Sequence, residues 1–145
     1  MTVKPETISV WTALVSASRE LVEAAEADLK AAGLPPLSWY DALLEIERSG
    51  PDGIRPFVLR QKLLLPQYGT SRLLDRVARA GLIERRICDD DGRGQVIYIT
   101  EQGRETRTKM WPVYARMLTS RIETTLSAQE AAQLSELLGK LRPPQ

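Results

Sequence analysis

The stretch of sequence that decides the fold is Pro56-Phe-Val-Leu-Arg-Gln-Lys-Leu-Leu-Leu-Pro-Gln-Tyr-Gly-Thr-Ser-Arg-Leu-Leu-Asp-Arg-Val-Ala-Arg-Ala-Gly81. A short helix is predicted over residues 56–64, because proline is favoured in the first turn of a helix. Pro66 interrupts this helix, and the three- and four-residue spacing of the next apolar side chains predicts a second helix from Gln67 to Ala80. Two short helices joined by so tight a break are typical of a helix-turn-helix.

The period of the apolar side chains changes from 3.6 to 2 directly after this segment, which indicates strands. Residues 83–88 and 95–100 are predicted to be the two strands of a hairpin. The loop between them, Asp89-Asp-Asp-Gly-Arg-Gly94, carries the glycines that favour such a turn. A hairpin that directly follows a helix-turn-helix predicts a winged helix-turn-helix over residues 54–100.

Two further helices are predicted before this segment. From residue 7 to residue 32, apolar side chains recur at three- and four-residue steps, and Gly33 is a suitable C-terminal cap. The next helix is predicted to start at Ser38 and to extend to about Arg48. Asp41 stands three residues after Ser38, so these two residues are interpreted as an approximate capping box.

Two more helices are predicted after the hairpin. Thr100 is a suitable N-cap, and its helix is expected to continue to about Leu126 with a kink at Pro112. Ser127-Ala-Gln-Glu130 is a capping box for the last helix, which carries a stripe of leucines. The fold class is therefore mainly α with a small antiparallel β-wing.

The whole chain, residues 1–145, is predicted to be a single domain that contains the winged segment. Residues 1–34 and 101–145 are predicted to form a helical dimerisation region, because amphipathic helices rarely leave an apolar stripe in water. A two-fold dimer would place its two recognition helices about 34 Å apart, which is one turn of DNA.

The composition excludes several classes of protein. The chain has no histidine, which excludes histidine metal ligands and histidine general bases, and no cofactor is predicted. Cys88 is the single cysteine, so an internal disulfide is excluded, and it is interpreted as a small strand residue. No apolar run reaches the roughly 20 residues of a membrane span, and no signal peptide is recognised, so a cytoplasmic protein with no membrane partner is expected.

The net charge of +1 hides an uneven distribution along the chain. Residues 55–86 carry eight basic and two acidic side chains, whereas residues 1–54 carry four basic and nine acidic ones. The last 59 residues are balanced. A basic segment between acidic and neutral flanks indicates an anionic partner at residues 55–86, and the alternative is a solvated basic face without a partner.

Four stretches together resemble the MarR family of bacterial transcriptional regulators. They are Leu37-Ser-Trp-Tyr-Asp-Ala-Leu-Leu44, Ser71-Arg-Leu-Leu-Asp-Arg-Val-Ala-Arg-Ala-Gly-Leu-Ile-Glu-Arg85, Asp91-Gly-Arg93 and Ile97-Tyr-Ile-Thr-Glu-Gln-Gly-Arg104. The resemblance implies a homodimer that is built from the terminal helices and binds pseudo-palindromic double-stranded DNA. It also implies that a small aromatic or phenolic effector releases the DNA, as in many members.

The sequence departs from the family pattern at three places. Leu64 stands where the turn of the helix-turn-helix usually holds glycine. Gly69 falls inside the predicted recognition helix, where glycine costs about 1 kcal/mol relative to alanine. Redox-sensing members carry a reactive cysteine in the first helix, and residues 7–32 contain none, so thiol sensing by that route is not expected.

The candidate DNA-binding residues follow from the position of the recognition helix, whose first turns read base edges. The residues predicted to face the major groove are Gln67, Tyr68, Thr70 and Ser71. Contacts to phosphates, which position a protein without specifying sequence, are predicted for Arg60 and Lys62. Arg72 and Arg76, which share one face of the recognition helix, are predicted to contact phosphates or base edges. The alternative for Gln67 and Ser71 is that they only hydrate a helix end.

Arg93 is predicted to lie at the tip of the wing between two glycines, where it suits the narrow minor groove. The alternative is an ordinary exposed arginine in a turn. The neighbouring aspartates do not form a calcium loop, since the twelfth position would be Tyr98 instead of glutamate, and no metal site is predicted. The family resemblance implies that Asp75 meets Arg93 and that Asp91 braces the base of the wing.

Aromatic side chains are candidates for an effector pocket, because buried tryptophan and tyrosine need a polar partner. They are Trp11, Trp39, Tyr40, Trp111 and Tyr114. The alternative for each of them is plain packing in the core or in the dimer.

The leading hypothesis is a dimeric repressor that binds DNA and responds to a small ligand. The second hypothesis is a winged-helix protein-interaction module that has lost sequence-specific DNA binding. A module that no longer binds DNA is expected to have a neutral recognition helix. The basic segment over residues 55–86 therefore argues against this hypothesis. An enzyme is not expected, because the chain has neither a histidine- or cysteine-based nucleophile site nor a glycine-rich phosphate loop.

Overall fold

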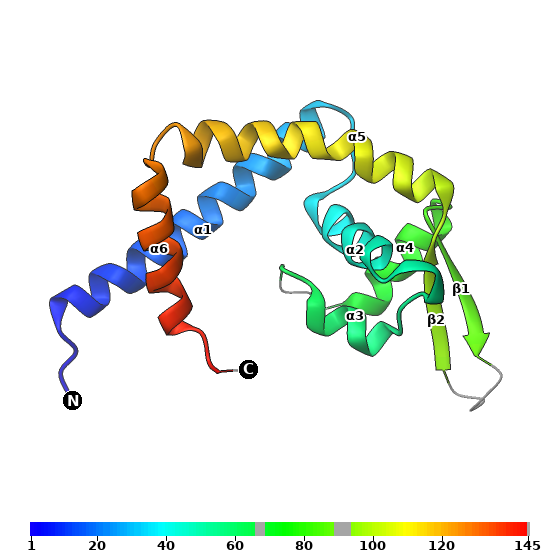
Figure 1. Ribbon diagram of the computed structural model, residues 1–145, viewed down its shortest axis with the longest axis horizontal. Helices are drawn as coiled ribbons and strands as arrows, with labels where there is room; N and C mark the ends of the chain where they lie inside the picture. Colours follow the sequence, from blue (N-terminus) through cyan, green and yellow to red (C-terminus); the bar gives the residue numbers. More distant parts are fainter. Residues whose placement is uncertain (66–68, 89–93, 145) are drawn as a thin grey trace. The chain divides into compact units, whose positions relative to one another are not determined.

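The computed structural model describes residues 1–65, 69–88 and 94–144, drawn in Figure 1. They form two compact units, of which one comprises residues 1–28 with 113–145 and the other comprises residues 29–112. The boundaries fall inside two long helices, α1 (Pro5–Ala31) and α5 (Glu101–Leu118). The assignment of residues 54–100 to DNA binding and of the outer helices to dimerisation stays a prediction.

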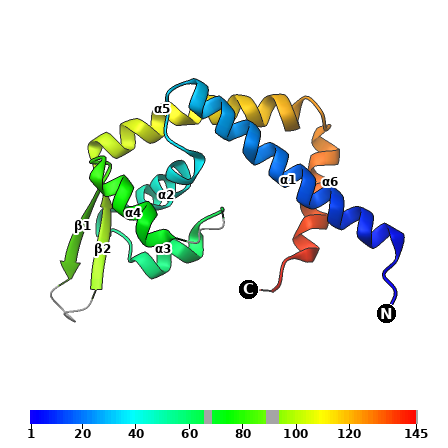
Figure 2. The same cartoon turned by 180° about the vertical axis from the view of Figure 1, so that it is seen from behind.

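The larger unit is the predicted winged helix-turn-helix preceded by one helix. Its elements are α2 (Leu37–Arg48), the 3₁₀ turn η1 (Gly50–Asp52), α3 (Pro56–Lys62), α4 (Thr70–Arg79), β1 (Ile83–Cys88), β2 (Gly94–Ile99) and the first part of α5. The strands pair antiparallel, with Ile83 opposite Ile99 and Cys88 opposite Gly94. Figure 2 shows the hairpin beside α4. The predicted fold class is confirmed.

One hydrophobic core holds the winged unit together. The buried side chains come from α2, α3, α4 and the hairpin, and the largest fully buried ones in this core are Leu43, Ile46, Leu59, Ile97 and Val77. Ile54 exchanges two backbone hydrogen bonds with Ile97, at 2.9 and 2.8 Å, which ties the segment before α3 to the wing. The helix-turn-helix and its wing are therefore one packed body.

The beginning of α2 differs from the prediction. Pro36 is the N-cap residue, no side chain caps the helix, and Ser38 lies inside it. Asp41 is buried and accepts hydrogen bonds from the backbone of a distant turn, so it is not available to a capping box. The predicted capping box of Ser38 and Asp41 is wrong, because a tertiary contact takes the carboxylate.

The recognition helix α4 begins at Thr70, and the part of the prediction that covers residues 66–68 lies outside the described residues. Gly69 is the N-cap residue of α4, with a φ of −150° and a ψ of 62°. The expected cost of a glycine inside the helix therefore does not apply, since an N-cap residue is not helical and glycine is tolerated there.

The helix that is expected from Thr100 to about Leu126 is divided into two elements. α5 continues past Pro112 but ends at Leu118, and a π-helical turn, η2 (Thr119–Glu123), follows in place of the expected helix to about Leu126. Thr124 Oγ1 donates to the Ser120 carbonyl at 2.6 Å, a local bond that competes with the regular helical pattern.

The last helix, α6 (Ala128–Leu141), confirms its predicted start. The Glu130 amide donates to Ser127 Oγ at 3.1 Å, and the Ser127 amide donates to Glu130 Oε1 at 2.9 Å. Both bonds of the capping box are present. Along the described residues, no helix is long and apolar enough to cross a membrane.

Candidate nucleic-acid interface

The recognition helix α4 has two chemically distinct faces. Leu73, Leu74 and Val77 are buried in the core of the winged unit. The opposite face is exposed and carries Ser71, Arg72, Asp75, Arg76 and Arg79. Because the apolar face fixes the rotation of the helix about its axis, the polar face points to solvent and can enter a groove of nucleic acid.

The predicted phosphate-binding residues are exposed cations. Arg60 and Lys62 lie on the solvent side of α3, and Arg72 and Arg76 lie one turn apart on α4. None of the ion pairs found among the described residues involves any of these four side chains. Cations without an internal partner keep their full charge for an external anion.

The predicted base-reading residues have different outcomes. Ser71 is exposed at the start of α4, in agreement with a role in the groove. The Thr70 hydroxyl is buried and has no hydrogen-bond partner among the described residues. Gln67 and Tyr68 lie outside the described residues, as do Asp91 and Arg93 of the wing. These roles stay predictions.

Asp75 has a partner that sequence reasoning missed. Arg85 of β1 donates to Asp75 Oδ1 at 2.7 Å and so ties the recognition helix to the wing. The expected partner, Arg93, lies outside the described residues. A signal for Arg85 is present in the strand, because alternate residues share a face and Ile83 is buried in the core. Arg85 therefore points toward the helix.

The other face of the hairpin carries a second basic group. The Arg86 guanidinium donates to the Glu84 carboxylate at 3.1 Å and lies 4.3 Å from the centre of the Tyr98 ring. Tyr98 stands directly opposite Glu84 in the strand register. The hydrogen bond to Glu84 raises the pKa of Arg86. Its charge is already paired, whereas no ion pair within residues 1–65, 69–88 and 94–144 involves the four predicted phosphate-binding residues.

A shallow depression of about 440 Å³ lies between the start of α2 and the start of α4. Trp39, Arg72 and Arg76 line it, together with Pro36, Ser38, Gly69 and Leu73. One predicted effector residue, Trp39, thus lies beside two predicted DNA-binding arginines. An aromatic ring and two cations can together hold a flat anionic molecule.

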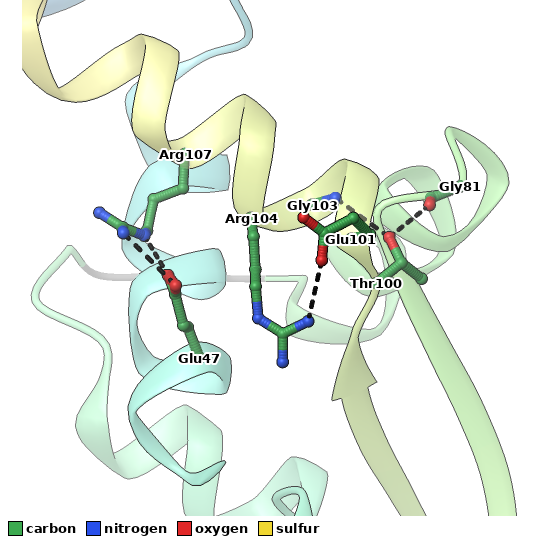
Figure 3. Close-up of polar contacts among 7 residues, drawn as sticks. All are labelled: Glu47, Gly81, Thr100, Glu101, Gly103, Arg104 and Arg107. Atoms are coloured by element: carbon green, nitrogen blue, oxygen red, sulfur yellow. Dashed lines mark hydrogen bonds and ion pairs between the residues drawn. The ribbon is translucent and has the colours of Figure 1, made fainter. Parts of the chain in front are cut away.

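Two other predicted effector residues meet between α2 and α5. The rings of Tyr40 and Trp111 stack with centroids 6.1 Å apart at an angle of 20°. On the same pair of helices, Arg107 binds the Glu47 carboxylate (Figure 3), and this hydrogen bond raises the pKa of Arg107. Tyr40 is buried, and its pairing with Trp111 favours a packing role. Trp11 and Tyr114 belong to the other compact unit.

The start of α5 is fastened to the end of the recognition helix. Thr100 Oγ1 donates to the Gly81 carbonyl at 2.7 Å and accepts from the Gly103 amide at 3.0 Å (Figure 3). The second bond is the N-cap that the sequence predicts for this helix. One hydroxyl therefore joins the loop that follows α4, the second wing strand and α5.

The packed helix pair, the hairpin and the exposed basic face of α4 define a winged helix-turn-helix protein. A family model described as the MarR family matches residues 32–94. The transcriptional repressor MprA of Escherichia coli K12 is 30% identical over 122 residues, which are 84% of this chain and 68% of that protein. The chain belongs to the MarR family of transcriptional regulators, which is a class of regulators and not of enzymes.

Other comparisons agree with this membership. An uncharacterised HTH-type transcriptional regulator of Bacillus cereus is 29% identical over 102 residues, and the match spans 66% of its length. Sco3205 of Streptomyces coelicolor, a MarR family regulator solved in complex with DNA, superposes with a TM-score of 0.87 at 20% identity over 97% of this chain and 88% of that one. An organohalide-sensing regulator with bound 2,4-dichlorophenol superposes with a TM-score of 0.81 at 20% identity, over 97% of this chain and 81% of that one.

Proposed function

We propose that the protein is a repressor that binds a pseudo-palindromic operator as a homodimer and releases it when a small aromatic ligand binds. The observation that carries the DNA-binding part is the exposed face of α4 and α3. There, four cations without an ion-pair partner among the described residues lie on α3 and on the recognition helix α4. The DNA complex of Sco3205 and the repressor MprA support this proposal.

Base reading and phosphate binding are separable by mutation. Lys62→Ala is expected to weaken binding to all duplexes about equally and to lower the salt slope by roughly one unit for each phosphate that is no longer neutralised. Ser71→Ala and Gln67→Ala are each expected to cost about 1–3 kcal/mol on a specific duplex and little on random DNA. The specific probe is a duplex that the protein selects from a random pool, and the control probe is the same duplex scrambled.

The two kinds of variant serve as controls for each other. Circular dichroism and light scattering of each variant should match the parent protein, because Ser71 and Lys62 are exposed. If Ser71→Ala and Gln67→Ala leave the selected duplex unaffected while Lys62→Ala removes discrimination, the proposed recognition helix is misplaced. If the parent protein selects no duplex at all, the proposed function fails.

Dimerisation is expected because apolar side chains of the smaller unit are exposed to solvent. Leu134, Leu137 and Leu141 of α6 are 46–61% exposed, and Leu134 lines an apolar depression between η2 and α6. The dimer interface that covers these side chains is expected to exceed the ~1,000 Å² of a biological interface. Light scattering at micromolar concentration is expected to give the mass of two chains. A monomer at that concentration would contradict the proposal, and the double variant Leu137→Ser/Leu141→Ser should shift the mass toward one chain.

Ligand release is supported by the depression beside the recognition helix. Trp39 lies in it next to Arg72 and Arg76, two of the cations assigned to DNA. A molecule bound there would occupy the same arginines as a phosphate. The relative with bound 2,4-dichlorophenol supports an aromatic ligand, and repeating the DNA titration with this phenol present measures the release.

A further inference from the structure

Asp41 is a buried carboxylate that contacts the turn of the helix-turn-helix. It lies in α2, is 7% exposed, and is the one charged side chain among the buried residues that the structure describes. Its Oδ1 accepts from the Leu64 amide at 3.1 Å, and its Oδ2 accepts from the Leu65 amide at 2.8 Å. These partners stand 23 and 24 residues further along the chain, so the contact is entirely tertiary.

The turn needs such an acceptor because it leaves the helix abruptly. α3 ends at Lys62, and Leu63 already has an extended backbone with a ψ of 133°. The next two amides are therefore deprived of the carbonyls that a continuing helix would offer. A partly buried amide without a partner is destabilising, and hydrogen bonds to an ionised group are among the strong ones.

The two bonds also fix the orientation of the turn. Each carboxylate oxygen takes one amide, so a rotation of the Leu64–Leu65 segment about either bond would break the other. Leu64 is held in this way although its own side chain is 76% exposed and can contribute little packing. Because the carboxylate is anchored in α2, the turn is tied to the core and not only to its neighbours in sequence.

The recognition helix begins five residues after Leu65, so the direction of this turn bears on where the helix starts. We propose that Asp41 is a positioning residue for sequence reading, which sets the first turn of α4 through the two amides. The proposal rests on the proposed function. Base-edge hydrogen bonds need the helix placed closely, whereas long cationic side chains reach phosphates over a range of positions. Removing the Asp41 carboxylate should therefore reduce discrimination more than general DNA binding.

The test uses three variants of the full chain. Asp41→Ala removes both acceptors, and Asp41→Asn keeps one acceptor oxygen and puts a donor against the second amide. Glu45→Ala is the matched control, since Glu45 is a carboxylate on the same helix that pairs with Arg48 and not with the turn. Urea unfolding identifies the conditions in which every variant is folded, and the DNA and exchange measurements are made there.

Asp41→Ala is expected to weaken the selected duplex by about tenfold or more and the scrambled duplex by less than about twofold, with Asp41→Asn in between and Glu45→Ala unchanged. Amide hydrogen exchange at Leu64 and Leu65 should accelerate by about tenfold or more in Asp41→Ala, while α2 keeps its protection. The exchange measurement needs no DNA, so it tests the anchor even if the protein binds no duplex.

Three results with the Asp41 variants would overturn the proposal. Unchanged exchange at both amides would show that Asp41 does not hold the turn. Faster exchange with unchanged affinities for both duplexes would leave Asp41 a purely structural residue. An equal reduction of affinity for both duplexes would assign its effect to general DNA binding. A parent protein that prefers no duplex would overturn the proposed function and the discrimination claim together, with the exchange result still deciding the anchor.

Discussion

Raising the salt concentration from about 50 to about 200 mM is expected to weaken binding of the selected duplex by about 10³-fold or more. Arg60, Lys62, Arg72 and Arg76 of each chain are exposed cations outside the ion pairs of the described residues, and a dimer presents them twice. Each phosphate that they neutralise releases counterions, so the logarithm of the binding constant falls linearly with the logarithm of the salt concentration. Fluorescence anisotropy over a series of salt concentrations measures the slope.

Two variants make this titration specific to the proposed interface. Arg60→Ala/Lys62→Ala should reduce the slope by about 0.9 for each phosphate that the variant no longer neutralises. Arg121→Ala, which removes an exposed arginine of η2 in the other compact unit, should leave the slope unchanged. A slope near zero for the parent protein would contradict phosphate binding by this face. Equal slopes for all three proteins would place the phosphate-binding residues elsewhere.

Gly103→Ala is expected to lower the free energy of unfolding by about 3 kcal/mol. A Cβ built on Gly103 would lie 2.1 Å from the Leu82 carbonyl oxygen and 2.8 Å from Ile99 Cγ1. The Leu82 carbonyl oxygen belongs to the backbone and accepts a hydrogen bond from the Thr100 amide at 3.1 Å. It therefore cannot move without disturbing Thr100, whose hydroxyl contacts Gly81 and Gly103 in Figure 3. Glycine at position 103 therefore allows α5 to approach the Leu82 backbone closely. Urea unfolding measures the destabilisation.

Gly139→Ala is the matched control for this substitution. Gly139 is also inside a helix, and no atom of the residues that the structure describes lies within 4 Å of a Cβ built there. Alanine is the better helix former, so this variant is expected to gain up to about 1 kcal/mol. If Gly103→Ala is as stable as the parent protein, the contact between α5 and the segment after α4 is looser than described.

Local sequence patterns are sufficient to predict most of the fold. The apolar spacing of Leu73, Leu74 and Val77 predicts both the recognition helix and its buried face, and the change of period after Gly81 predicts the wing. The sequence identifies Thr100 and Ser127 as caps, and both caps are present. Each of these signals lies within a few residues of the feature it predicts, because capping and amphipathic patterns are properties of one element.

The errors fall at one tertiary contact and at two helix ends. Asp41 has the spacing of a capping residue, but its carboxylate binds the turn 23 residues away. Gly69 has the sequence position of an interior helix residue, but the helix starts one residue later. The predicted helix that contains α5 extends through residues 119–123, where hydroxyl groups bond to nearby carbonyls and a π-helical turn forms.

The sequence by itself determined the class of this protein: a winged helix-turn-helix with a basic segment over residues 55–86 and a resemblance to MarR regulators. Apolar periodicity, capping residues and charge are properties of short stretches of chain, so the sequence alone is sufficient to identify them. Only the tertiary structure decided which groups meet, namely Asp75 with Arg85, Glu47 with Arg107 and Asp41 with the turn before the recognition helix. These pairs join residues 10 to 60 positions apart, and their meeting depends on how whole elements pack.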